Sequence, residues 1–238
     1  MNQDVLFNLV NVAKGFVKGK EKISIFDGLN MQIKKNDFLA IMGPSGSGKT
    51  TLLNLLGGVD QPTSGEIMFD NQRIDTLSES KLAQWRANNV GFIFQFYNLM
   101  PMLNAQRNVE LPLLLTHLSS KERQERVQNA LKLVGLDDRA NHMPGEMSGG
   151  QQQRVAIARA VVSDPKLLLC DEPTGDLDRK TADEILEMLQ LLNRDFGKTI
   201  VMVTHDPAAA KFARHILYLD KGEFVTREVR NERPVSDL

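Results

Sequence analysis

The feature of this sequence that most restricts the fold is a glycine-rich loop that ends in lysine and threonine. Residues 43–50 read GPSGSGKT and fit the pattern G-x-x-x-x-G-K-[ST] at every fixed position. Such a loop wraps backbone N–H groups around phosphate oxygens, at the positive N-terminal end of the helix that follows it. A short apolar run at 38–42 precedes the loop, and a leucine-rich stretch at 50–56 follows it. The sequence therefore predicts a buried strand, a phosphate loop and a helix in that order.

The residues of this loop have separate chemical tasks. Lys49 is expected to reach the β and γ phosphates of a nucleotide, and the Thr50 hydroxyl is expected to bind Mg²⁺. The predicted phosphate-binding residues are Gly43, Pro44, Ser45, Gly46, Ser47, Gly48, Lys49, Thr50 and Thr51. Because kinases, GTPases, helicases and transport motors share this loop, the loop alone does not say what the phosphate energy drives.

Length and composition exclude several classes of protein. The 238 residues suffice for a substantial core, and a net charge of −1 lacks the strong positive field that non-specific nucleic-acid binding requires. The single cysteine, Cys170, cannot form an internal disulfide. No secretory signal is expected, and the longest apolar runs, such as 111–115, fall far short of the roughly twenty residues that span a bilayer. These observations favour a cytoplasmic protein without a nucleic-acid partner, whose membrane contact, if any, comes through another subunit.

Strand and helix patterns alternate after the phosphate loop. Buried-strand patterns occupy 90–94, 167–170, 199–203 and 215–219. Helix starts are predicted from capping boxes at Ser119 with Glu122 and at Thr181 with Glu184. Alternation of this kind indicates an α/β fold with a mostly parallel sheet. Extended patterns at 5–12 and 23–33 add β structure near the N-terminus, where the lysines at 14, 18, 20 and 22 are expected in a solvated loop.

The strand at 167–170 leads directly into two carboxylates, Asp171 and Glu172. A strand of this form is expected beside the strand that carries the phosphate loop, so Asp171 would hold Mg²⁺ and Glu172 would act as general base on the attacking water. An acidic turn after a strand is the alternative, and the phosphate loop in the same chain makes it the weaker one.

A second anion site is predicted at residues 147–151, which read MSGGQ. Two glycines and a serine there precede a helical pattern at 152–162, so they lie at a helix N-terminus. One triphosphate has no evident need of two such sites in the same subunit, whereas two copies of the chain facing each other would each complete the other's pocket. A flexible glycine hinge before a surface helix is the alternative.

Together these segments resemble the nucleotide-binding subunits of ABC transporters over essentially the whole chain. Six motifs of that family are matched in the family's order. They are Walker A at 43–50, the Q-loop at Gln95, the signature at 147–151, Walker B at 167–172, the D-loop at 175–178 and the H-loop at His205. The resemblance implies ATP and Mg²⁺ as ligands and ATP hydrolysis as the activity.

The resemblance also implies roles for residues that the patterns alone leave open. Gln95 would sense Mg²⁺ and the attacking water, His205 would contact the γ-phosphate, and Asp178 would lie across a dimer seam. The implied catalytic residues are Glu172, His205, Gln95 and Lys49, and the implied metal ligands are Thr50, Gln95 and Asp171. The residues that would grip the nucleotide of the opposite subunit are Ser148, Gly149, Gly150 and Gln151. Phe16, where the family more often has tyrosine, would stack on adenine or else pack among the N-terminal strands.

The implied fold is a P-loop NTPase (RecA-like) core with an N-terminal antiparallel β-subdomain and an inserted α-helical subdomain. Residues 1–238 would form a single ABC ATPase domain, with 1–94 and 161–238 as the β-subdomain and core and 95–160 as the helical subdomain. The stretches at 56–60, 94–101 and 108–113 resemble the MacB, LolD and FtsE group, whose members pair with permeases of few transmembrane helices (FtsX, MacB or LolC-like). This implies a homodimer, peripheral on the inner face of the cell membrane, that drives export or mechanotransmission by such a permease, with a lipoprotein, peptide or drug as substrate.

Three alternatives remain open at the level of sequence. The apolar residues Phe96, Tyr97, Leu99, Met100 and Met102 could form a groove for a permease helix or pack inside the helical subdomain. An FtsE-like ATPase could signal through a transmembrane partner to cell-wall hydrolases without transport. A non-transport ABC ATPase of translation or DNA repair fits less well, because such proteins usually carry two cassettes or long coiled-coil arms.

Overall fold

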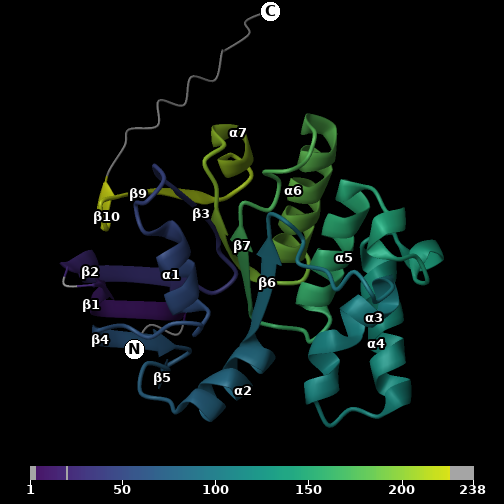
Figure 1. The fold of residues 1–238 in the computed structure, drawn as a ribbon, viewed down its shortest axis with the longest axis horizontal. Helices are drawn as coiled ribbons and strands as arrows, with labels where there is room; N and C mark the ends of the chain where they lie inside the picture. The colour runs from purple at the N-terminus through teal and green to yellow at the C-terminus, as the bar shows by residue number, and fades with distance from the viewer. Residues whose placement is uncertain (1–3, 20, 226–238) are drawn as a thin grey trace, which may run out of the picture.

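The computed structural model describes residues 4–19 and 21–225, whose strands form two sheets (Figure 1). The smaller sheet is antiparallel throughout and has four strands. In spatial order they are β2 (Glu21–Lys34), β1 (Val5–Lys18), β4 (Ser64–Phe69) and β5 (Gln72–Arg73). The N-terminal extended patterns are therefore confirmed, and both strands are longer than the apolar patterns alone indicate.

The larger sheet has six strands and carries the phosphate loop. In spatial order they are β10 (Glu223–Val225), β9 (His215–Asp220), β3 (Phe38–Met42), β8 (Thr199–Val203), β7 (Leu167–Asp171) and β6 (Val90–Phe94). Every pairing from β9 to β6 is parallel, and β10 pairs antiparallel with β9. The prediction of a mostly parallel sheet is thus confirmed.

The parallel strands are apolar on both faces because each face is covered. In β3, Leu39 and Ile41 face one buried cluster while Ala40 and Met42 face another, as the period of two in a strand requires. The first cluster includes the leucines of α1 (Lys49–Leu56), which therefore lies between the two sheets (Figure 1). The second cluster includes α5 (Gly149–Val161) and α6 (Arg179–Arg194) on the opposite face.

The remaining helices lie around this core. They are α2 (Glu79–Asn89), α3 (Ala105–Glu110), α4 (Ser120–Leu133), α7 (Pro207–Ala210) and the short 3-10 turns Leu111–Leu115, Asp137–Arg139 and Pro144–Glu146. Helices α3, α4 and α5 come between β6 and β7 in the chain and gather at one end of the molecule (Figure 1). In the described part of the chain, no helix is both long enough and apolar enough to cross a membrane.

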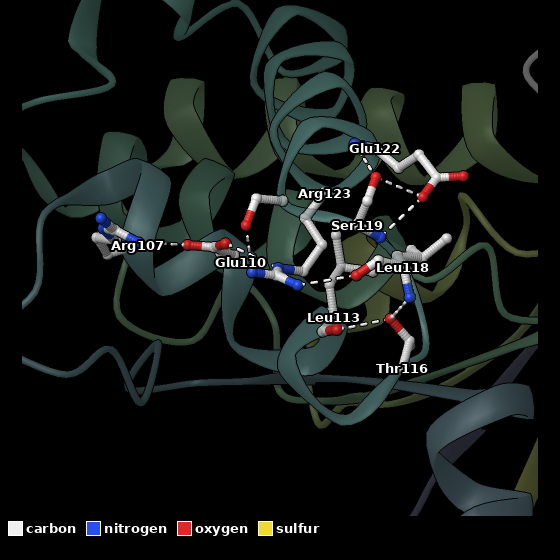
Figure 2. A network of polar contacts seen from close by, with 9 residues as sticks. Arg107, Glu110, Leu113, Thr116, Leu118, Ser119, Glu122 and Arg123 are labelled. Carbon is white, nitrogen blue, oxygen red and sulfur yellow. Dashed lines mark hydrogen bonds and ion pairs between the residues drawn. The ribbon is translucent and has the colours of Figure 1, made fainter.

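A polar network fixes α3 to the start of α4 (Figure 2). Glu110 accepts hydrogen bonds from Arg107 at 2.8 Å and from Arg123 at 3.1 Å. Arg123 also donates to the Leu118 carbonyl, 2.9 Å away. The two arginines hold the pKa of the Glu110 carboxyl below its ordinary value, against the effect of burial.

Of the two capping boxes predicted from the sequence, the one at Ser119 is confirmed, and so is the helix N-terminus predicted at residues 147–151. Ser119 caps α4 in a capping box with Glu122, and Ser148 caps α5 in the same way with Gln151. The prediction of Thr181 as the cap of α6 is wrong. The cap is Asp178, whose carboxylate accepts bonds from the Thr181 backbone N–H and hydroxyl, so the helix begins at Arg179.

The prediction of a solvated loop is wrong for Lys14. This residue lies in β1 and is buried, and its ammonium contacts Asp60 at 2.6 Å and the Gln61 carbonyl at 2.8 Å. A buried ammonium requires such partners, because burial without them costs several kcal/mol.

Candidate nucleotide site

A cavity of about 790 Å³ lies at the carboxyl ends of the parallel strands. Four strands contribute residues to it at or just after their carboxyl ends: β3 the phosphate loop, β6 Gln95, β7 Asp171 and Glu172, and β8 His205. Parallel strands end at the same sheet edge, which is where open α/β sheets bind their ligands. The predicted residues that line the cavity are Gly43, Pro44, Ser45, Gly46, Gly48, Lys49, Thr50, Thr51, Gln95, Asp171, Glu172 and His205.

The phosphate loop has the form of a phosphate cradle. Gly48 has a φ of +102°, and a Cβ there would lie 2.9 Å from the Ile25 Cγ2 atom, so only glycine fits. The Lys49 ammonium folds back onto the carbonyls of Gly43 and Pro44, at 2.9 and 2.8 Å. The Ser47 hydroxyl is buried and has no hydrogen-bond partner among the described residues. An unpaired donor and a lysine held at the mouth of the loop fit a site whose acceptors are phosphate oxygens.

Asp171 and Glu172 stand side by side at the end of β7. Burial and the adjacent Glu172 charge raise the pKa of the Asp171 carboxyl, while the Lys49 charge opposes them. Two neighbouring carboxylates in a half-buried position are a favourable place for a cation. Within the described residues no three His, Cys, Asp or Glu side chains cluster as a metal site. Mg²⁺ commonly takes one or two protein carboxylates and completes its shell with water and substrate phosphates, which is compatible with this arrangement.

Glu172 and His205 are in direct contact. The His205 Nδ1 atom lies 2.9 Å from Glu172 Oε1, and the His205 backbone N–H donates to Oε2 at 3.3 Å. Glu172 has a φ of +50°, which is uncommon for a residue with a side chain. Its backbone N–H is fixed to the Val203 carbonyl at 3.0 Å, which ties the loop after β7 to the end of β8. This local arrangement directs the Glu172 carboxylate into the cavity beside His205.

The signature segment, residues 147–151, is not among the residues that line this cavity. Ser148 and Gln151 instead close the N-terminus of α5: the Ser148 N–H donates to Gln151 Oε1 at 2.9 Å, and the Gln151 N–H donates to Ser148 Oγ at 3.3 Å. Asp178 is likewise outside the cavity, at the start of α6. The structure thus brings the phosphate loop together with Gln95, the two carboxylates and His205, and leaves the second anion site apart from them.

Phe16 also lies outside the set of cavity-lining residues. Its ring is 45% exposed in β1, and the Lys14 ammonium lies 4.9 Å from the ring centroid. One face of the ring is therefore engaged by a cation. Adenine stacking by Phe16 stays a prediction.

Five cavity residues were not predicted as site residues. They are Ile25, Phe94, Phe96, Asn98 and Val203. Four of them adjoin predicted positions, so proximity in sequence to Gln95 and to the end of β8 was an available signal. Ile25 comes from the antiparallel sheet, and no local pattern in the sequence places that strand over the phosphate loop.

Comparison with known proteins agrees with this site. The family model described as ABC transporter matches residues 26–175. The ABC transporter ATP-binding protein MJ0796 of Methanocaldococcus jannaschii is 47% identical over 94% of this chain and 96% of its own length. The lipoprotein-releasing system ATP-binding protein LolD of Acinetobacter baylyi is 43% identical over 93% of this chain and 97% of its own.

A solved structure extends the similarity to the fold. The ATP-binding cassette MJ0796, described as a dimer in a post-hydrolysis state bound to ADP and Pi, superposes with a TM-score of 0.85 at 45% identity. The match covers 93% of this chain and 97% of that chain. The P-loop core and antiparallel sheet predicted above are therefore those of an ABC cassette. The chain belongs to the ABC transporter family, as an ATP-binding, ATP-hydrolysing cassette of the MacB and LolD group.

Proposed function

We propose that this chain is the motor subunit of an exporter of the MacB and LolD type, acting as an ATP-dependent homodimer with a membrane permease. ATP and Mg²⁺ bound by the phosphate loop of one subunit would be completed by the signature segment of the other. ATP closes the dimer, hydrolysis releases it, and the movement passes to the permease. The dimeric MJ0796 cassette with ADP and Pi, and the lipoprotein-releasing role of the LolD relative, support this proposal.

The observation that carries the proposal is the separation of the two anion sites within one chain. Ser148 and the first residues of α5 present a helix N-terminus that does not line the phosphate-loop cavity. A second subunit placed with two-fold symmetry brings this N-terminus to the partner's cavity, and the partner does the same in return. A monomer would lack the contacts that the partner's signature segment makes with the γ-phosphate.

The roles of the site residues follow from their chemistry. Lys49 would bind the β and γ phosphates, and Thr50, Gln95 and Asp171, which line the cavity, would hold Mg²⁺, which would supply positive charge to the phosphate oxygens. Glu172 accepts a proton from the attacking water, and His205 holds that carboxylate in place and contacts the γ-phosphate. Asp178 lies near the dimer seam, and Phe16 stacks on adenine. We also propose that 95–160 form a helical subdomain and that 1–94 and 161–238 form the β-subdomain and the core.

The surface that meets the permease is proposed to combine the exposed apolar residues after Gln95 with a hollow that Asn98 of the same segment also lines, together with α2, β6, the turn Leu111–Leu115 and the end of α5. The hollow has a volume of about 420 Å³ and is lined by Phe92, Phe94, Pro112 and Leu115, among others. Phe96, Met100 and Met102 are exposed, whereas Leu99 packs against the helical core. Leu99 therefore fits packing inside the helical subdomain, and the exposed residues of the cluster fit a groove for a permease helix. Exposed methionine, leucine and phenylalanine side chains suit the apolar face of a permease helix, and they would place the cassette on the inner face of the cell membrane.

The dimer proposal is tested by measuring Mg²⁺-ATPase activity per subunit over a hundredfold range of protein concentration. Activity per subunit should rise with concentration, because the complete site forms only in the dimer. Lys49→Ala should abolish activity at every concentration. A constant activity per subunit from a strictly monomeric preparation, unchanged when Ser148 is replaced, would rule the proposal out.

The permease surface is tested by Met102→Glu, with Val59→Glu as the matched control. Met102 is 75% exposed and Val59, which lies outside this surface, is 56% exposed, so neither change disturbs a buried core. Met102→Glu should keep ATPase activity of the isolated chain and lose capture of the permease, and Val59→Glu should keep both. Unchanged capture by Met102→Glu would exclude the exposed residues after Gln95 from the permease contact.

A further inference from the structure

The segment around Gln95 has an unusual backbone. Gln95 follows the end of β6, and Tyr97 and Asn98 then adopt left-handed conformations with φ of +60° and +48°. Consecutive left-handed residues with side chains are rare, and they persist only when their surroundings hold them. A local backbone bond from the Tyr97 N–H to the Phe94 carbonyl at 3.3 Å and a bond from the Tyr97 hydroxyl to Asp176 at 3.4 Å contribute to holding it. Three further contacts come from one neighbouring helix, α5.

Gln153 makes the contact on the N-terminal side of Gln95. This residue is fully buried on α5, and its amide nitrogen donates to the Phe94 carbonyl at 3.3 Å and to the Pro173 carbonyl. The amide oxygen has no partner among the described residues. Since only the NH₂ end can donate to two carbonyls, the orientation of this side chain is set by them. Gln153 thus joins α5 to the residue before Gln95 and to the loop after Glu172.

Arg159 makes the contact on the C-terminal side of Gln95. Its guanidinium donates to the Tyr97 carbonyl at 2.7 Å and to the Asn98 carbonyl at 2.6 Å. No carboxylate in the described residues pairs with it, and burial lowers the pKa of this guanidinium. A largely buried arginine that binds only carbonyls fixes the backbone through the planar geometry of its donors.

The third contact joins the segment to the start of α5. The Tyr97 hydroxyl lies over Gly149, where a Cβ atom would come within 2.7 Å of the phenol oxygen. Gly149 directly follows Ser148 in the signature segment. The segment around Gln95 therefore contacts α5 at its first residue, through Gln153 in its middle and through Arg159 near its end.

We propose that Gln153 and Arg159 are positioning residues for Gln95. They hold the carbonyls on both sides of it against α5, so that Gln95 and Ser148 move as one body. A displacement of Gln95 at the nucleotide is then transmitted to the signature segment without bending of the intervening chain. This inference rests on the proposed role of Gln95, and it assigns two residues outside the cavity a function in hydrolysis.

The test is a double-mutant cycle in the full chain, read as kcat of the Mg²⁺-ATPase. Arg159→Lys keeps the charge and loses the planar fork, and Gln153→Met keeps the volume and loses the donors. Each is measured alone and combined with Gln95→Ala. If both act through Gln95, each should lower kcat about tenfold alone and less than about twofold when Gln95 is already alanine.

Arg154→Lys is the matched control. Arg154 also lies on α5 but binds the Val134 carbonyl and Glu184, away from the segment around Gln95. This variant should change kcat less than about twofold in both backgrounds. Two variants are used so that a folding failure of one, detected by thermal unfolding, leaves the other to complete the cycle.

The outcomes separate the inference from the proposed function. Equal fold-losses of kcat with and without Gln95→Ala, or a loss for Arg154→Lys equal to that for Arg159→Lys, would overturn the inference and leave the role of Gln95 intact. An unchanged kcat for Gln95→Ala alone would refute the proposed role of Gln95 and the inference with it. If Arg159→Lys and Gln153→Met lower kcat in the parent chain but not in the Gln95→Ala background, the inference and the proposed role of Gln95 are both supported.

Discussion

Glu172 and His205 are 33 residues apart in the sequence, yet their side chains meet at 2.9 Å. The cause is the order of the sheet, in which β7 and β8 are parallel neighbours and end at the same edge. Each residue could be placed at a strand end from its apolar run. The contact between them depends on the positive φ of Glu172, which no sequence pattern signals.

The first prediction concerns the proton acceptor. Glu172→Gln replaces the carboxylate that accepts the proton with an amide that cannot. It should lower ATP turnover by about a hundredfold or more, while ATP binding is retained. The variant should also accumulate as a dimer with ATP on size-exclusion chromatography. Glu184→Gln is the control, because Glu184 pairs with Arg154 outside the cavity. Turnover at the parent rate in Glu172→Gln would show that another group accepts the proton.

The second prediction follows from the raised pKa of Asp171. Above pH 3.8 the unfolded chain has lost the Asp171 proton that the nucleotide-free fold still binds, so stability falls as pH rises through the folded pKa and stays lower at neutral pH. Asp171→Asn removes this cost. It should raise the unfolding midpoint at pH 7 and abolish Mg²⁺-dependent turnover.

Unfolding of both proteins without nucleotide, from pH 7 down toward pH 4, checks this prediction. The gain from Asp171→Asn should shrink as the pH falls, because the native carboxyl becomes protonated and the two side chains become alike. An Asp171→Asn variant less stable than the parent at pH 7, or a gain in stability that does not depend on pH, would show that the charged Asp171 carboxylate does not destabilise the fold.

At the scale of elements, α4 and α5 begin with the same device. Ser119 with Glu122 and Ser148 with Gln151 both form reciprocal capping boxes, on helices of 14 and 13 residues. The box at Ser119 caps α4, whereas the box at Ser148 caps α5 and is also proposed to bind a γ-phosphate. The matched pair Ser119→Ala and Ser148→Ala therefore separates capping from catalysis.

Both serine variants should lose about 1 kcal/mol of unfolding free energy, the usual value of an N-cap hydroxyl. Ser148→Ala alone should lower ATP turnover, by about tenfold, because one donor to developing phosphate charge is lost. Urea unfolding and ATPase assays on the two purified variants make the comparison. Equal ATP turnover in Ser119→Ala and Ser148→Ala would show that the Ser148 hydroxyl takes no part in hydrolysis.

The start of α6 shows where sequence patterns fail. Asp178 with Thr181 and Thr181 with Glu184 are two overlapping capping patterns three residues apart. The structure selects the first, because the Thr181 hydroxyl donates to Asp178 at 2.6 Å and Glu184 is engaged by Arg154 at 2.9 Å. Arg154 lies 30 residues away in the sequence, so this competition is decided by tertiary contacts that no local pattern contains.

At the scale of the whole molecule, the strands and helices of the parallel sheet were predictable, and the relation between the two sheets was not. The apolar runs of β3 and β8 are buried throughout, those of β6 and β7 are largely buried, and all four can be recognised locally. Ile25 reaches the phosphate loop from the antiparallel sheet only because α1 packs between the sheets. The sequence likewise does not show where the signature segment of a second chain would lie relative to the phosphate loop, because one chain holds only one copy of each.

The central claim is that each nucleotide site is shared between two chains, and mixing two inactive variants tests it most directly. Lys49→Ala damages the phosphate loop, and Ser148→Arg places a bulky charge at the signature segment, so each homodimer has two defective sites. In a heterodimer one site combines both defects and the other is intact, so an equal mixture should regain up to about a quarter of the parent activity. A mixture as inactive as its components, with both variants folded and Ser148→Arg still binding ATP, would contradict the account.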